Sequence, residues 1–444
     1  MIYYKHNQTG GAFVYRKIIS YLEEWKSSQH RKPLILQGAR QVGKTYSILE
    51  FGRTHYENVA YFNFETDPKL NETFAENISP DYLIPILSHI AGVSIVREKT
   101  LIVFDEIQLC ERALTSLKYF CEEAPGYHII VAGSLLGVAV NRANFSFPVG
   151  KVDMKTPYPM DMEEFMLALG ENDLVARIKE SFASDTPLPA ALHDAAMQLY
   201  RQYLVIGGMP ECVRQFVDTR NYILVRHTQD TILASYLNDM SKYNNLNKIK
   251  KTRLAYDNIT VQLSKKKTRF QYKLIKKGGR ASEFENAIEW LCLSGIVSQV
   301  YKVENVRKPL ENYRDIDSFK IYVSDLGLLC AKKGLAANDI LYMVEELNDF
   351  NGGMTENYVN VQLTINGYTT YYWESDRGAE VDFVIQREGQ LIPVEVKSAD
   401  NKKAKSLKVY MDTYKPAYAI KLSARNFGFE DGKKTVPLYA AFCI

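Results

Sequence analysis

The chain has 444 residues, of which 46% are hydrophobic and 24% charged, and it carries a net charge of +3. This composition excludes a disordered or fibrous protein, and the length predicts two or three globular domains. The six cysteines include no CxxC pair, which argues against a zinc site or a disulfide framework. Because neither a signal peptide nor an apolar run of membrane-spanning length is recognisable, we expect a cytoplasmic protein.

The first third of the chain alternates short apolar strands with helical stretches. Near-continuous apolar runs occur at 33–38, 59–65, 100–106 and 128–134, and a fifth strand is expected within 151–160. Such runs are typical of buried parallel strands, and the distances between them suit crossover helices. The pattern predicts an α/β fold with helices on both faces of a parallel sheet.

Residues 38–45, GARQVGKT, form a complete GxxxxGKT motif between the first strand and a helix. Gly38 and Gly43 allow the backbone N–H groups to close around the phosphates. Lys44 then reaches the β- and γ-phosphate oxygens, and the Thr45 hydroxyl ligates Mg²⁺. The motif therefore predicts ATP and Mg²⁺ as cofactors.

Three further side chains are expected at the same edge of the sheet. Asp105 closes the apolar strand LIVFD and would hold the Mg²⁺ shell, and Glu106 would polarise the attacking water. Ser134, at the end of the next strand, is a candidate sensor of the γ-phosphate. The alternatives are a strand that simply ends in two acids and a serine that serves an ordinary turn.

The middle of the chain is helical and then strongly basic. Residues 161–240 show helical patterns, interrupted by a turn at 205–211, VIGGMPE. Residues 248–280 contain twelve Lys or Arg and one acid, Asp257, so this segment carries +11 and the rest of the chain −8. A local basic segment indicates a polyanionic partner such as DNA, and a solvated lysine face is the alternative.

A helix and a strand follow the basic segment. Ser282 and Glu285 have the spacing of a capping box, and Gly295 ends the helical pattern. IVSQVYKV, at 296–303, then has the pattern of a strand. A basic helical region, a helix and a strand in this order predict a winged helix.

The C-terminal region returns to α/β character, with strands expected at 368–375, 379–386 and 390–398. In the last strand Glu395 and Lys397 share one face, because alternate residues point the same way. A turn at 387–389 would bring Asp382 beside them. Two adjacent carboxylates can share a divalent ion, and a lysine can orient water next to it. The alternative is an edge hairpin with one wet face.

The order of these motifs resembles a large group of bacterial and archaeal AAA+-type P-loop ATPases that carry a C-terminal restriction-endonuclease-like domain of unknown function. The resemblance covers nearly the whole chain. It rests on the following stretches: GARQVGKT, YFNFE, LIVFDEIQ, AGSLLG, YPMDMEEF, GGMPE, EVDFVI and IPVEVKS.

The resemblance implies four parts: a P-loop AAA+-like core at 1–160, a helical lid at 161–240, a winged-helix-like basic segment at 241–310 and a PD-(D/E)xK nuclease-like mixed α/β domain at 311–444. It adds Glu356, in GGMTENYV, to the metal ligands Asp382 and Glu395, with Lys397 as the catalytic lysine. A nuclease-like fold does not by itself imply cleavage.

One departure from the family concerns the γ-phosphate. This chain has Gly150-Lys151 where the family has Gly-Arg, and lysine supplies a point charge without the bidentate fork of arginine. Such an arginine often acts in trans within AAA+ rings, so the departure weakens the expectation of a homo-oligomer. Arg142 lies nearby but matches no motif position.

Three functions are consistent with the sequence. The first is an ATP-gated enzyme that binds DNA through the segment 248–280 and cleaves it with the C-terminal domain. The second is an ATP-driven DNA-binding switch or assembly protein whose nuclease-like domain is not catalytic. The third is a protein remodeller in which the basic segment is only a solvated surface.

Overall fold

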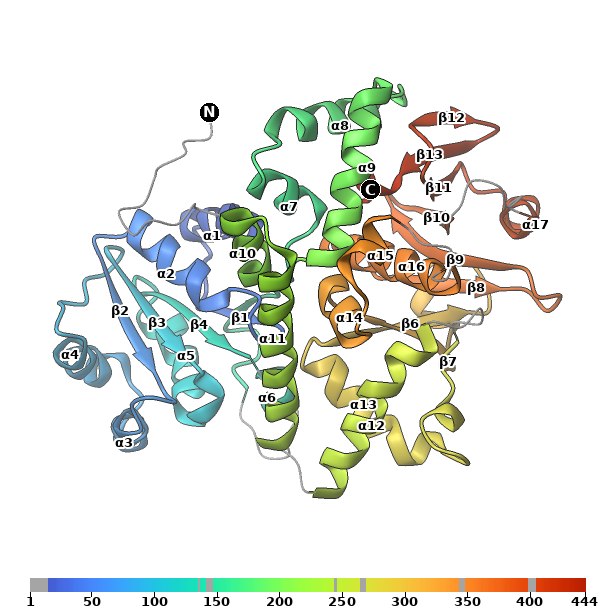
Figure 1. Ribbon diagram of the computed structural model, residues 1–444. Coiled ribbons are helices and arrows are strands. Elements are labelled where there is room, and N and C mark those ends of the chain that lie inside the picture. The colour runs from blue at the N-terminus through green and yellow to red at the C-terminus, as the bar shows by residue number, and fades with distance from the viewer. Residues whose placement is uncertain are drawn as a thin grey trace. The chain divides into compact units, whose positions relative to one another are not determined.

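The computed structural model describes residues 15–134, 136–140, 147–242, 246–263, 269–342, 348–397 and 405–444. They divide into two compact units (Figure 1). The P-loop unit contains 15–158 and 293–295, and the C-terminal unit contains 159–292 and 296–444.

The P-loop unit is built on a parallel sheet, which in the described residues has five strands in the order β2-β3-β4-β1-β5. Since the strands run the same way, the residues that follow β1, β3 and β4 meet at one edge of the sheet. The α/β prediction for this part is confirmed. The strands are β1 (Leu34–Gln37), β2 (Asn58–Asn63), β3 (Thr100–Asp105), β4 (His128–Gly133) and β5 (Asp153–Lys155).

Both faces of this sheet are covered by helices, which explains why its central strands β1, β3 and β4 are almost entirely buried. Leu34 and Leu36 pack with α1 (Lys17–Ser27) and α2 (Lys44–His55), whereas Ile35 points to the opposite face. That second face is covered by α3 (Lys69–Glu76), α4 (Pro80–Ala91) and α5 (Glu111–Glu123). The short elements η1 (Ile107–Leu109) and α6 (Leu136–Val140) complete the described part of the unit.

The C-terminal unit begins with helices where helices were expected. The turn GGMP, between α9 and α10, is anchored by Asp325, whose Oδ2 accepts a hydrogen bond from the Gly208 N–H at 2.6 Å. A Cβ on Gly208 would lie 2.0 Å from the Met160 carbonyl oxygen, so only glycine fits there. The helices are α7 (Met162–Ala168), α8 (Asn172–Ser184), α9 (Ala190–Ile206), α10 (Pro210–Thr219), α11 (Tyr222–Lys242), α12 (Leu246–Leu263) and α13 (Ala281–Leu293).

A mixed sheet forms the second half of this unit, with eight strands among the described residues in the order β12-β13-β11-β10-β9-β8-β6-β7. The 3-10 turns η2 (Tyr272–Leu274), η3 (Leu310–Tyr313) and η5 (Leu438–Cys443) accompany it. Its strands are β6 (Val297–Val303), β7 (Arg314–Val323), β8 (Tyr371–Glu374), β9 (Glu380–Arg387), β10 (Gln390–Val396), β11 (Ala419–Ser423), β12 (Gly428–Glu430) and β13 (Lys433–Pro437).

Helices also contact this sheet. α16 (Asn348–Ile365) is fixed to β7 by the Asn357 side chain, which accepts from the Val323 N–H and donates to the Val323 carbonyl, both at 2.8 Å. The apolar side of α17 (Lys405–Tyr414) packs Leu407 and Tyr410 against Trp373 and Val381. The short helices α14 (Leu326–Lys332) and α15 (Ala337–Leu341) link β7 to the start of α16.

The strand expected to end a separate winged helix belongs instead to the large sheet. β6 pairs with β7 on one side and β8 on the other, so a boundary between 310 and 311 would cut through the β6–β7 hairpin. The helix before it begins at Ala281, one residue ahead of the expected cap Ser282. No helix in the described residues is long and apolar enough to cross a membrane.

Candidate functional site

The P-loop follows β1 and opens α2. Gly43 adopts a left-handed φ of +84°, and α2 begins at the next residue. The buried Lys44 Nζ donates to the Gly38 and Ala39 carbonyls at 3.0 and 2.7 Å. Lys44 therefore hydrogen-bonds to the backbone of its own loop. Phosphate oxygens of a bound nucleotide would replace these two carbonyls as acceptors.

Thr45 and Asp105 meet beside this loop. The Thr45 hydroxyl donates to Asp105 Oδ2 at 2.9 Å, and the Tyr61 hydroxyl donates to the same oxygen at 2.8 Å. Hydroxyl and carboxylate oxygens suit Mg²⁺, which prefers hard oxygen ligands. The pair thus fits a magnesium ion in donor chemistry.

Glu106 and Ser134 lie at the same edge of the sheet. Glu106 has an uncommon left-handed φ of +52°, and burial raises its carboxyl pKa above the ordinary value. Ser134 is buried and follows β4, the strand that lies between β1 and β3. The sheet order thus brings together the carboxyl ends of β1, β3 and β4, which are followed by the P-loop, Glu106 and Ser134.

Two further side chains shape this site, and neither was assigned a role from the sequence. The buried Arg16 donates to the Val42 carbonyl at 2.9 Å and to the Tyr158 carbonyl at 2.7 Å, which braces the P-loop from outside. Gln108 Nε2 donates to Glu106 Oε2 at 2.5 Å, and its Oε1 is buried with no hydrogen-bond partner in the described part of the chain. The Arg16 partners are 26 and 142 positions away, so no local motif links them, whereas Gln108 lies two residues after Glu106 within the stretch LIVFDEIQ, which was the available signal.

Lys151 lies far from the P-loop. It lies two residues before β5, whose Asp153 pairs with Leu34 at the start of β1, so Lys151 is at the edge of the sheet opposite the P-loop. Its ammonium group forms an ion pair with Glu122 at 2.8 Å. A phosphate contact by Lys151 within its own chain is therefore excluded by this geometry. Arg142 lies outside the described residues.

A second polar site lies where β9, β10 and α16 meet. Asp382, on β9, accepts a hydrogen bond from the Val396 N–H of β10 at 2.7 Å. Lys397 forms an ion pair with the buried Glu395, and Glu356 reaches the site from α16. We call Glu356, Glu380, Asp382, Glu395, Lys320 and Lys397 the carboxylate–lysine cluster.

Lys320, on β7, is a member of this cluster that sequence reasoning missed. It is 1% exposed, and its Nζ lies 2.7 Å from Glu356 Oε1 and 2.5 Å from Glu380 Oε1. Burial opposes its charge, but the surrounding carboxylates outweigh this effect and raise the Lys320 pKa. The Tyr322 hydroxyl also donates to Glu356. A single lysine within the apolar run SFKIYV was the available signal.

Carboxylates outnumber cations in the cluster by four to two. Burial, together with Glu356 and Glu395, raises the pKa of Asp382 well above its usual range. Burial also raises the pKa of Glu395 despite its ion pair with Lys397. Glu395 Oε2 is buried and has no hydrogen-bond partner among the described residues. One divalent cation would balance the charge and satisfy this oxygen.

The side chains do not, however, form a ready-made metal site. Within the described ranges, no three His, Cys, Asp or Glu side chains converge closely enough to hold a metal ion. The common site expected from Glu356, Asp382 and Glu395 stays a prediction, because in the structure Lys320 pairs with Glu356 and Lys397 pairs with Glu395. A metal would need Lys397 to release Glu395.

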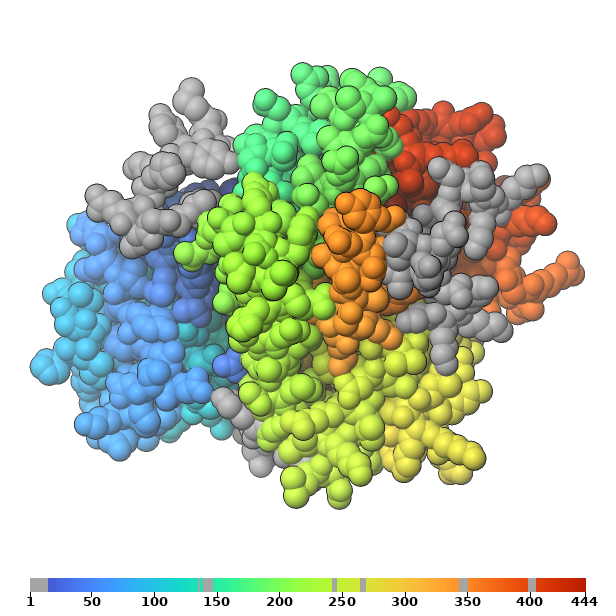
Figure 2. Space-filling view, in the orientation of Figure 1, coloured from blue at the N-terminus to red at the C-terminus, as the bar shows by residue number. Residues whose placement is uncertain are grey.

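The basic segment is only partly described, since Lys265, Lys266 and Lys267 lie outside the described residues. The space-filling view shows its yellow-green and yellow atoms at the surface of the C-terminal unit (Figure 2). The cations that are exposed are Lys248, Lys250, Arg253, Arg269, Lys273, Lys276, Lys277 and Arg280.

Lys320→Met should lower the free energy of unfolding of the C-terminal unit by about 3–5 kcal/mol, because two acids lose their buried cation. Lys302→Met, a neighbouring lysine on β6, should change it by about 0.5 kcal/mol or less. In a Trp25→Phe background the two remaining tryptophans, Trp290 and Trp373, both report on this unit during urea unfolding. Adding Glu356→Gln should recover part of the loss, and equal effects of the two lysine variants would refute a structural role for Lys320.

Comparison with known proteins gives three family matches, each covering less than half of the chain. Residues 30–166 match the model of an AAA domain. Residues 197–339 and 351–441 match two domains of unknown function, DUF8612 and DUF4143. No curated protein matches.

Several solved structures are similar at low identity. The Walker-type ATPase PABY2304 of Pyrococcus abyssi is 13% identical with a TM-score of 0.45, covering 72% of this chain and 96% of that one. The ORC2 protein of Aeropyrum pernix, in ADPNP–ADP complexes, is 10% identical with a TM-score of 0.36, covering 77% and 96%. The ORC1 protein of the same organism, in complex with DNA, is 12% identical with a TM-score of 0.29, covering 72% and 91%. From the family match and the P-loop geometry, residues 30–166 form an AAA-type P-loop domain.

Proposed function

We propose that the chain binds and hydrolyses ATP in the P-loop unit and that the nucleotide state governs the action of the C-terminal unit on DNA. The observation that carries the proposal is the hydrogen bond of 2.9 Å between Thr45 and Asp105 beside the Lys44 ammonium group. This arrangement offers oxygen ligands for Mg²⁺ next to a cation for the phosphates.

In this proposal each side chain has one task. Lys44 leaves the Gly38 and Ala39 carbonyls to bind the β- and γ-phosphates, and Thr45 and Asp105 would hold Mg²⁺, which would supply positive charge beside the phosphates. Glu106 accepts the proton of the attacking water, a role that suits a carboxyl group with a raised pKa. Ser134 contacts the γ-phosphate. If Lys151 contributes, it does so from another copy of the chain.

Glu106→Gln should leave ATP binding within about threefold of wild type and lower the rate of hydrolysis at least about 100-fold, because the amide cannot accept the proton. Lys44→Ala should lose nucleotide binding as well. Fluorescent ATP-analogue titration and a phosphate-release assay separate the two effects. Hydrolysis that survives Glu106→Gln would remove Glu106 from the mechanism.

DNA is proposed as the partner because exposed cations gather in 248–280. Phosphate contacts by such cations make binding fall steeply as salt rises. A protein remodeller with a merely solvated lysine face would show no such dependence, so the salt dependence of DNA binding decides between these two functions.

Phosphodiester cleavage is the action that the carboxylate–lysine cluster suggests for the C-terminal unit. The buried Glu395 Oε2, with no hydrogen-bond partner in the described residues, favours a missing cation next to Asp382. A divalent metal there would supply an activated water and stabilise the leaving oxygen. Asp382 and Glu395 would hold the metal, and Lys397, released from Glu395, would orient the water.

The alternative is a DNA-binding switch without cleavage. Its supporting observation is that Lys320 and Lys397 already pair with Glu356 and Glu395, which are two of the three expected ligands. In that case the cluster stabilises the fold, and DNA binding is the output of the ATPase cycle.

Metal binding separates these two functions without an activity assay. In a Lys44→Ala background without nucleotide, we expect one Mn²⁺ to bind per chain, measured by electron paramagnetic resonance of the free ion. Asp382→Asn or Glu395→Gln should weaken this binding at least about tenfold, whereas Glu388→Gln, an exposed acid in the β9–β10 turn, should not. Binding that is absent, or indifferent to Asp382, would favour the non-catalytic switch.

A further inference from the structure

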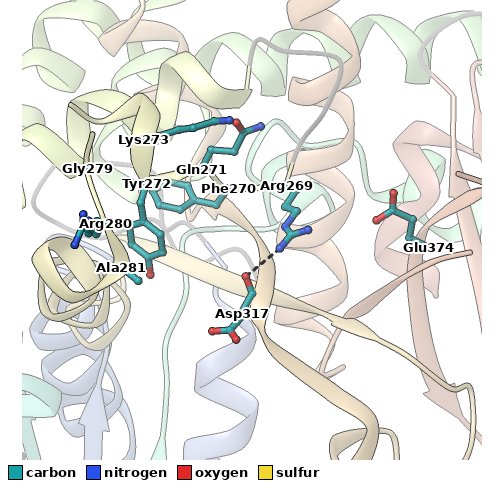
Figure 3. A pocket seen from close by; sticks show the side chains of 10 residues that line it. All are labelled: Arg269, Phe270, Gln271, Tyr272, Lys273, Gly279, Arg280, Ala281, Asp317 and Glu374. Carbon is teal, nitrogen blue, oxygen red and sulfur yellow. Dashed lines mark hydrogen bonds between the residues drawn. The ribbon is translucent and has the colours of Figure 1, made fainter. Parts of the chain in front are cut away.

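An open pocket of about 720 Å³ lies in the C-terminal unit, between the turn η2, the start of α13 and the ends of β7 and β8 (Figure 3). Its size is within the range of about 300–1,000 Å³ that is typical of ligand sites. In the view of Figure 3 the Arg269 side chain lies between Tyr272 and Glu374, and its guanidinium points to the Asp317 backbone. The described residues that line it include Arg269, Tyr272, Lys273, Arg280, Asp317 and Glu374.

The three cations of this pocket are available to a ligand. Arg269, Lys273 and Arg280 are all exposed. The Arg269 guanidinium contacts the Asp317 carbonyl at 3.5 Å, a long hydrogen bond. Within the described residues, neither Lys273 nor Arg280 has a side-chain hydrogen bond or ion pair. Three cations against two acids leave a net positive lining, which suits a phosphate group.

The pocket also has an aromatic wall. The Tyr272 ring is half-buried and is held by edge contacts with Phe270, 5.3 Å between ring centroids, and Phe319, 6.1 Å. A ring fixed in this way can stack on a nucleobase without losing much freedom. A carboxylate such as that of Glu374 can accept a hydrogen bond from the amino group of a base.

Two residues of the pocket are direct neighbours of the carboxylate–lysine cluster. Arg269 forms an antiparallel bridge with Lys320, and Glu374 pairs with Glu380 across β8 and β9. Lys320 and Glu380 in turn form an ion pair of 2.5 Å. A ligand bound in the pocket would therefore lie beside the carboxylates of the carboxylate–lysine cluster.

We propose that this pocket binds single-stranded nucleic acid, with phosphates on Arg269, Lys273 and Arg280 and one base stacked on Tyr272. A base inside a duplex has both faces covered by its neighbours, so it offers no face to Tyr272. The pocket thus selects an unpaired strand and leads it to the cluster. This inference rests on the proposed action on DNA and names its substrate as single-stranded.

The test is fluorescence anisotropy with the full chain and a labelled 20-nucleotide strand in EDTA, where no metal-dependent cleavage occurs. Lys273→Ala/Arg280→Ala should weaken binding at least tenfold and lower the salt slope by about 1.4, which is two phosphate contacts. Lys405→Ala/Lys408→Ala removes the same charge from exposed positions on α17, outside the basic segment, and should weaken binding less than threefold.

Tyr272→Leu separates stacking from charge. It should weaken binding of the strand at least about fivefold and leave binding of an abasic strand of equal length unchanged. DNA and RNA strands of one sequence are compared: binding of the DNA strand at least as tight as that of the RNA strand supports the proposal, and a clear preference for RNA would contradict a DNA substrate.

Three results would overturn the pocket proposal: equal losses in the two double variants, no effect of Tyr272→Leu, or a duplex that binds as tightly as the single strand. The binding assay contains no metal, and cleavage and ATP hydrolysis are measured separately with metal. Each of these three results could therefore occur while both activities persist, so the binding assay does not test the proposed function itself.

Discussion

The C-terminal unit depends on one buried ion pair network, centred on the Lys320 ammonium group. Lys320 ties β7 to α16 through Glu356 and to β9 through Glu380. A buried lysine is stable only when carboxylates surround it, and carboxylates gathered around a lysine are stable only while it remains. Burial raises the pKa values of Asp382 and Glu395, and the neighbouring carboxylates of the network raise them further. Stability and candidate chemistry therefore depend on the same charges.

The P-loop unit also contains a buried lysine, but that lysine has different partners. Its lysine, Lys44, is held by two neutral carbonyls, which phosphate oxygens can replace at little cost. Lys320 is held by charged partners and has no comparable freedom. The contrast suggests that Lys44 responds to ligand, whereas Lys320 keeps the carboxylate–lysine cluster in place. Lys397 has a charged partner, Glu395, as Lys320 does, but its side chain is partly exposed. Its freedom to change partners is therefore intermediate between that of Lys44 and that of Lys320.

The sequence predicted most of the P-loop unit because its signals are local. Buried parallel strands are apolar along their whole length, and the GxxxxGKT motif marks the turn after β1. It did not predict Arg16 or Lys320, because their partners are distant in the chain: Arg16 and Tyr158 are 142 positions apart, and Lys320 and Glu356 are 36 apart. The strand β6 was recognised, but its pairing with β8 was not, since local alternation does not identify a partner strand.

In the proposed function, the nucleotide state of the P-loop unit controls cleavage by the C-terminal unit. The most direct test is the cleavage of supercoiled plasmid and single-stranded circular DNA by the full chain with Mg²⁺, with and without ATP. We expect cleavage that changes with ATP, that is lost in Lys397→Ala and that no longer responds to ATP in Lys44→Ala. Cleavage at one rate in all nucleotide conditions would contradict nucleotide control, and intact ATP hydrolysis with no cleavage of either DNA would contradict a nuclease and leave the DNA-binding switch.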